Sequence, residues 1–128
     1  MKNSYFHKML IALTLTLAPH IAFAHAHLVT ATPKEKSVVH ESPSQVTLKF
    51  SEELEPALCN IEVKNLQTGR TVNQGKTEAS GESKDTLQVA LGSLDTKKGQ
   101  YQVSWKVVSK DGHKMKGTYE FTLEQTAK

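Results

Sequence analysis

Apolar and polar residues alternate along most of the chain after residue 44. In residues 45–50, QVTLKF, the side chains of Val46, Leu48 and Phe50 fall on one face of an extended strand. The same period of two recurs in residues 61–64, 86–91, 100–108 and 118–123. No ten-residue stretch of this region shows a convincing i, i+3, i+4 apolar stripe, so the pattern predicts short strands and little helix.

The last two of these segments carry four of the five aromatic residues that follow residue 24. Their inward positions would be Tyr101, Val103, Trp105 and Val107 in one strand and Tyr119, Phe121 and Leu123 in the next. Turn-forming clusters such as Ser-Pro-Ser and Gln-Thr-Gly separate the strands. Short strands joined by turns, in a chain of this size, predict an all-β fold: an antiparallel sandwich or a small barrel.

The first 24 residues have the composition of a secretory signal peptide. Lys2 and Lys8 precede the almost wholly apolar residues 9–18, and small residues follow. Pro19 and His20 interrupt the apolar run after about ten residues, whereas a transmembrane helix needs about 20. We therefore expect a soluble exported protein. Two cleavage sites compete: Ala-Phe-Ala would release a chain beginning at His25, and Ala-His-Ala one beginning at His27.

Cleavage after Ala24 would make residues 1–24 a signal peptide and residues 25–128 a single domain. Loss of Lys2 and Lys8 lowers the formal net charge from +3 to +1. A nucleic-acid binder needs a concentrated basic stripe, whereas these lysines are scattered among glutamates along the sequence. We therefore expect no nucleic-acid partner. The oligomeric state is open at this point, with a monomer as the default expectation.

The single cysteine and one of the histidines are expected to have no chemical role. Cys59 has no partner for an internal disulfide and is expected to pack as a small apolar residue. His40 precedes a Ser-Pro pair and is expected to be an exposed turn residue.

Either cleavage site leaves a histidine at the start of the chain, which gives that end a distinctive chemistry. A free terminal amine and the ring Nδ1 of the same histidine can bind one metal ion in a single chelate ring. Planar nitrogen donors suit Cu(II), which accepts tetragonal coordination by nitrogen and oxygen. An N-terminal histidine therefore indicates a candidate copper ligand.

The sequence Asp111-Gly112-His113 offers two further ligand types close together. In an extended segment Asp111 and His113 would project to the same side, and Gly112 would let the backbone bend between them. The alternative is purely structural, because Asp-Gly between two strands is also a strong hairpin-turn signal. On that interpretation His113 is an exposed side chain without a role.

Longer motifs at both ends of the chain carry a family resemblance. They are HAHL at residues 25–28, then ATP, LKFSEELE, and the closing YQVSWKVVSKDGHKMKGTYEF. Together they resemble the CopC family of periplasmic copper-resistance and copper-carrier proteins, across essentially all of residues 25–128. The closing motif is the most specific part, since its glycine, aromatic, aspartate and histidine positions all match.

The resemblance implies a small Greek-key β-barrel, cupredoxin-like or immunoglobulin-like, with one Cu(II) ion bound at one end. Carried over by position, the family's ligands fall on His25, Asp111 and His113, and His27 is an additional candidate. This ligand set favours cleavage after Ala24. The resemblance also suggests an inner-membrane protein of the CopD type as the partner.

One departure from some relatives concerns Cu(I). Those relatives bind Cu(I) through a methionine-rich segment and a histidine, whereas residues 54–84 contain neither residue type and Met115 is the only methionine after residue 24. Because Cu(I) requires soft sulfur ligands, we expect no Cu(I) methionine site.

Two other function classes fit parts of the pattern. The same amine-plus-imidazole chelate serves lytic polysaccharide monooxygenases, but Asp111 would occupy the open coordination position that oxygen needs, and the aromatic residues fall mostly at inward positions. A metal-free immunoglobulin-like interaction module remains the second alternative. The expectation is a carrier that is not an enzyme.

Overall fold

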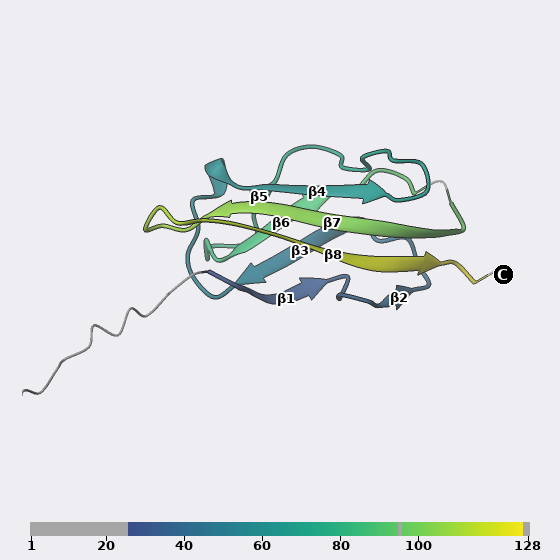
Figure 1. Ribbon diagram of the computed structural model, residues 1–128, viewed down its shortest axis with the longest axis horizontal. Helices are drawn as coiled ribbons and strands as arrows, with labels where there is room; N and C mark the ends of the chain where they lie inside the picture. The colour runs from purple at the N-terminus through teal and green to yellow at the C-terminus, as the bar shows by residue number, and fades with distance from the viewer. Residues whose placement is uncertain (1–25, 95, 127–128) are drawn as a thin grey trace, which may run out of the picture.

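The computed structural model describes residues 26–94 and 96–126, which form two packed β-sheets (Figure 1). The predicted signal peptide and His25 lie outside the described residues. The strands are β1 (Leu28–Thr32), β2 (Val38–Val39), β3 (Gln45–Phe50), β4 (Asn60–Asn65), β5 (Glu78–Ala79), β6 (Thr86–Ala90), β7 (Lys98–Val108) and β8 (Lys114–Glu124). Within the described ranges the only helical element is the 3-10 turn η1 (Pro56–Leu58), and no helix there is long and apolar enough to cross a membrane.

Each sheet has four strands. The first has the order β1-β3-β6-β5 with antiparallel pairing throughout, and the second has the order β2-β8-β7-β4. In the second sheet only β2 runs parallel to its neighbour. The all-β sandwich predicted from the sequence is confirmed.

All five predicted strands are present, and residues 45–50 match β3 at both ends. β7 and β8 are longer than predicted because their pairing continues through polar residues, from Lys98 opposite Glu124 to Val108 opposite Lys114. Alternation did not reveal β1, β2 or β5. Two of these have only two residues, and the register of β1 against β3 shifts between Leu28 and Thr30.

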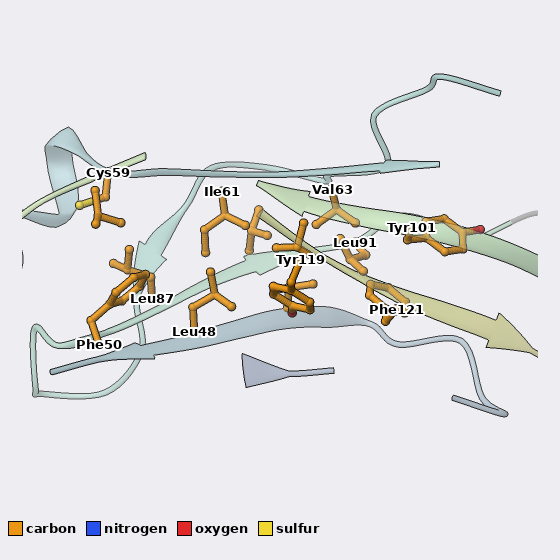
Figure 2. Close-up of a cluster of buried hydrophobic side chains, with 14 of the residues drawn as sticks. Leu48, Phe50, Cys59, Ile61, Val63, Leu87, Leu91, Tyr101, Tyr119 and Phe121 are labelled. Carbon is orange, nitrogen blue, oxygen red and sulfur yellow. The ribbon is translucent and has the colours of Figure 1, made fainter. Parts of the chain in front are cut away.

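The core lies between the sheets and contains the predicted inward side chains (Figure 2). Phe50, Tyr101 and Phe121 are at most 1% exposed, and the rings of Tyr101 and Phe121 stack with centroids 5.4 Å apart. Burying each such aromatic side chain stabilises the fold by about 1.5–3 kcal/mol. The stacked pair therefore joins β7 to β8 within the core between the two sheets.

Cys59 also lies in the core, at its edge beside η1 (Figure 2). Its Sγ accepts a weak hydrogen bond from the Val108 N–H at 3.4 Å. Burial raises the pKa of the thiol, and the hydrogen bond from Val108 only partly opposes that effect. The prediction that Cys59 packs as a small buried residue is confirmed.

Trp105 is only partly buried and lies over Gly117 on the facing strand. A Cβ on residue 117 would lie 2.2 Å from the Trp105 ring, far inside van der Waals contact. The ring also meets Phe50 edge-on at 6.2 Å and Tyr119 at 6.1 Å. The glycine thus makes room for the indole.

We expect Gly117→Ala to destabilise the protein by about 1–3 kcal/mol, because the indole must move out of its packed position. Gly92→Ala is the matched control, since its Cβ would meet only the Val72 carbonyl oxygen at 3.7 Å. Urea unfolding followed by the fluorescence of the single tryptophan measures both variants. Equal stabilities of the two variants would contradict this packing.

Candidate metal centre

The hairpin between β7 and β8 carries Asp111 and His113 in its turn. The Ser109 N–H donates to the His113 carbonyl oxygen at 2.9 Å, and the Gly112 N–H donates to the Ser109 carbonyl oxygen at 2.9 Å. Gly112 has φ +91°, a conformation that a side chain would strain. Residues 109–113 therefore form a closed loop of defined shape.

Asp111 and His113 meet within this turn. The Nδ1 atom of His113 lies 2.9 Å from Oδ2 of Asp111. The sequence suggested that an extended segment would place the two side chains on one side, and that explanation is wrong. The chain turns at residues 110–112, so Asp-Gly also acts as the hairpin signal. Residues 111–113 thus form part of the turn and also provide the two side chains that contact each other.

The Ser109 hydroxyl contacts both members of this pair. This residue is 1% exposed, and its hydroxyl donates to Oδ1 of Asp111 while accepting the His113 N–H at 3.1 Å. The His113 carbonyl oxygen lies 3.3 Å from the same hydroxyl, but an ionised carboxylate is the stronger acceptor for its one proton. A buried hydroxyl therefore fixes the carboxylate that contacts the imidazole.

These contacts hold the pKa of Asp111 at about 2. The hydrogen bond from Ser109 contributes most, and the hydrogen bond from the His113 side chain comes next. The carboxylate is thus ionised at neutral and mildly acidic pH. Donation of the Nδ1 proton to Asp111 leaves the lone pair on Nε2, which is the arrangement that carboxylates commonly impose on metal-binding histidines.

The start of the domain lies at the same end of the sandwich as this turn (Figure 1). The His27 N–H donates to Ser51 Oγ at 3.0 Å, and the Ser51 N–H donates to the His27 carbonyl oxygen at 2.9 Å. Two residues further on, the Glu53 carbonyl oxygen accepts the Lys110 N–H at 2.9 Å. Ser51 and Glu53 are at most about 7 Å apart, because two residues span no more than that. The loop of residues 51–55 therefore joins His27 to the Asp111 turn.

The structure brings some of the predicted site residues together. Asp111 and His113 form a pair, the backbone of His27 is tied to the adjoining loop, and His25 lies outside the described residues. His40 is exposed and bonds the Glu124 carbonyl oxygen through Nδ1 at 2.9 Å, at the far end of β8. Within residues 26–94 and 96–126, no three His, Cys, Asp or Glu side chains form a group that could hold a metal ion.

The positioning function of Ser109 was not predicted from the sequence. The available signal was a serine two residues before an aspartate in a turn, since serine hydroxyls commonly bond to nearby turn groups. That signal does not distinguish a buried bridging hydroxyl from an exposed one. Pairing of Ser109 with Leu54 in a short β-bridge is what buries it.

Replacing Ser109 by alanine should raise the pKa of Asp111 from about 2 toward its ordinary value, because the largest contribution to the shift is removed. The lowered pKa means that ionised Asp111 stabilises the fold above pH of about 4, and that this stabilisation is lost as the pH falls toward 2. Carbon-13 NMR titration of the aspartate carboxyl groups in metal-free protein measures the change. Ser104→Ala, within β7, is the control, and an unchanged Asp111 titration in Ser109→Ala would refute the bridging role.

Comparisons with known proteins agree with this architecture. The model of the CopC domain matches residues 28–124. Protein YobA of Escherichia coli is 36% identical over 117 residues, covering 90% of this chain and 91% of that protein. The copper transport protein CutJ of Bacillus subtilis is 32% identical over 115 residues, which cover 90% of this chain but only 21% of that longer protein.

Two crystal structures share the fold. CopC from Methylosinus trichosporium OB3b superposes with a TM-score of 0.73 at 33% identity, covering 81% of this chain and 98% of that one. PcoC, a methionine-rich copper resistance protein from Escherichia coli, gives a TM-score of 0.67 at 26% identity, covering 79% of this chain and 100% of that one. In sequence and in fold, the chain belongs to the CopC family.

Proposed function

We propose that this protein is a periplasmic carrier that binds one Cu(II) ion through His25, Asp111 and His113. The observation that supports this most is the Asp111–His113 pair, held at 2.9 Å by a buried serine at the end of the sandwich where the domain begins. Family membership provides the chemical context, because named relatives are copper resistance and copper transport proteins. Copper is the cargo, and the mechanism is ligand exchange.

Burial of Ala26 supports a mature chain that begins at His25. Ala26 is 0% exposed and belongs to the core cluster. Cleavage after Ala26 would remove a buried residue and convert the His27 N–H, which bonds Ser51, into a charged terminus. Cleavage after Ala24 leaves both features intact. We therefore propose residues 1–24 as the signal peptide and residues 25–128 as the domain.

The proposed ligands differ in whether they must lose a proton to bind Cu(II). The amine and ring of His25 and the ring of His113 must be deprotonated, whereas Asp111 is already ionised. Asp111 can keep Oδ1 on the Ser109 hydroxyl, and Oδ2 would have to leave the His113 Nδ1 atom in order to contact the metal. His27, next to the loop of residues 51–55, remains a candidate for an additional contact.

The partner that we propose is an inner-membrane protein of the CopD type. The Bacillus subtilis copper transport protein supports this, since the present chain corresponds to about a fifth of its length. In that relative, a segment like this chain is part of a longer polypeptide that transports copper. A separate carrier would need to meet such a protein by diffusion.

We further propose that the protein has no Cu(I) site and is not an oxidase. Among the described residues Met115 is the only methionine, in contrast to methionine-rich PcoC. The aromatic side chains in residues 26–94 and 96–126 are all buried or partly buried, so this part of the surface offers no flat aromatic platform for a polymer. Oxygen consumption with ascorbate and polysaccharide would reveal an oxidase.

The proposed ligands can be tested with the processed protein and three changes. One extra residue before His25 converts the amine into an amide, and His113→Ala removes an imidazole. Each should weaken Cu(II) binding by about 100-fold or more, measured by competition with a chelator of known affinity. His40→Ala is the matched control, at the other end of β8, and should bind Cu(II) like the parent protein.

If the extended protein binds copper as tightly as the processed one, the N-terminal chelate is wrong. If neither form binds Cu(II), the protein is better described as a metal-free exported β-sandwich. Circular dichroism of every variant establishes that the fold is retained.

Cu(II) affinity should fall as the pH is lowered, because protons compete for His25 and His113. Asp111 should contribute nothing to this dependence above pH of about 3, since its pKa is about 2. Isothermal titration between pH 5 and pH 8 in several buffers measures the number of protons released. At pH 5, where the amine and ring of His25 and the ring of His113 ordinarily carry protons, release of fewer than two protons would contradict the proposed ligands.

A further inference from the structure

The outer face of the second sheet has two adjoining grooves beside the hairpin turn. The groove nearer the turn has a volume of about 460 Å³, and its lining residues are Leu58, Lys106, Val107, Val108, Lys114, Met115 and Lys116. The adjoining groove, of about 530 Å³, shares Lys106 and Lys116 with it. We refer to the first as the lysine groove.

The lysine groove combines an apolar floor with a basic rim. Leu58 is 65% exposed, which is unusual for a leucine, and Val108 is partly exposed beside it. Lys106, Lys114 and Lys116 are all exposed around them. An exposed apolar surface with a charged rim is typical of sites where proteins meet.

The sequence suggested that lysines were scattered, but the fold gathers these three. Lys106 on β7 lies directly opposite Lys116 on β8, and Lys114 follows on the same face two residues earlier. Among the described residues none of the three forms an ion pair, and the acidic residue of the adjoining groove, Glu62, pairs with Lys64 at 3.5 Å. Positive charge is thus concentrated on a domain whose net charge is near zero.

Placing two lysines directly opposite each other weakens a sheet, because like charges repel across the strands. Nothing in the packing of β7 against β8 requires these residues, since both side chains point away from the core. Bound carboxylates would relieve the repulsion. The arrangement is therefore better explained by binding than by folding.

Acidic residues at this end of the molecule lie in the loop of residues 51–55. Glu53 pairs with Lys110 at 3.1 Å, and the Glu55 backbone hydrogen-bonds to Val108 and Leu58, which line the lysine groove. The three lysines of the groove outnumber Glu55, so a negatively charged partner would be attracted to the groove. Lys114 directly follows His113, so a molecule bound in the groove would lie beside the Asp111–His113 pair.

We propose that the lysine groove docks an acidic segment of the protein with which this carrier exchanges copper. An apolar side chain of that segment would contact Leu58 and Val108, and its carboxylates would contact Lys106, Lys114 and Lys116. That the partner exchanges copper rests on the proposed function, whereas docking of an acidic apolar segment does not.

A protein segment fits this surface better than a membrane does. Three lysines around a small groove give only weak attraction to an anionic bilayer, for which stable binding requires larger basic clusters or an inserted apolar anchor. The groove, of about 460 Å³, instead has room for a few side chains of a peptide segment. Its apolar floor would be unused on a flat lipid surface.

The test uses metal-free, nitrogen-15-labelled protein and a synthetic peptide, Glu-Glu-Leu-Glu-Glu, with blocked ends. Amide shifts should change in residues 106–108 and 114–116. The double variant Lys106→Gln/Lys116→Gln, and separately Leu58→Ser, should weaken peptide binding by about fivefold or more. Raising the ionic strength from about 0.01 M to about 0.15 M should also weaken it.

Lys34→Gln/Lys97→Gln is the matched control, because it removes the same charge from exposed positions outside the lysine groove. It should change peptide affinity by less than about twofold. Equal losses in both double variants, or shifts confined to other strands, would overturn the proposal. Binding to phosphatidylglycerol vesicles that exceeds binding to the peptide would favour a membrane and would also overturn it.

The docking test is independent of the copper test. Lys106→Gln/Lys116→Gln should bind Cu(II) like the parent protein, and its stability to urea should be unchanged or higher because a repulsion has been removed. His113→Ala should bind the peptide normally. Failure of copper binding alone would therefore refute the proposed function, and failure of peptide binding alone would refute the docking surface.

Discussion

The antiparallel pairing of β7 with β8 is the constraint on which the rest of this structure depends. Eleven consecutive residue pairs join the two strands, from Lys98 opposite Glu124 to Val108 opposite Lys114. On the inner face this register stacks Tyr101 on Phe121 and leaves space for Trp105 over Gly117. At its end it closes the turn that holds Asp111 against His113. On the outer face it sets Lys106 against Lys116. The core, the Asp111–His113 pair and the lysine groove are thus consequences of one register.

Where alternation is regular and one face is buried, the sequence was sufficient to predict the fold. β3 was predicted at both ends because Val46, Leu48 and Phe50 leave no other register for a buried face. β1 was missed because a register shift breaks its alternation, and β2 and β5 because two residues cannot establish a period. Such strands form because they pair with neighbouring strands, and their own sequences do not show a regular alternation of apolar and polar residues.

The candidate site was predictable in its residues but not in its geometry. The spacing of Asp111 and His113 fits either an extended segment or a turn, and only the tertiary contacts of residues 109–113 decide between them. The contribution of Ser109 depends on its burial against Leu54, which is far away in sequence. The lysine groove escaped prediction for the same reason, because Lys106 and Lys116 become neighbours only through the hairpin.

In the proposed carrier, the metal would join two parts of the chain that the fold already keeps close. The hairpin turn provides a rigid, ionised half-site, and the loop of residues 51–55 holds the start of the domain beside it. Such an arrangement requires little rearrangement on binding. It would also release the ion readily when protons or competing ligands reach the terminal histidine.

The most direct test of this account is the intact mass of the exported protein, recorded in a native spectrum before and after one equivalent of Cu(II). We predict a chain that begins at His25 and gains a single copper ion, with no further ion taken up as Cu(I). A chain that begins at His27, or one that begins at His25 and gains no copper, would contradict the proposed metal centre.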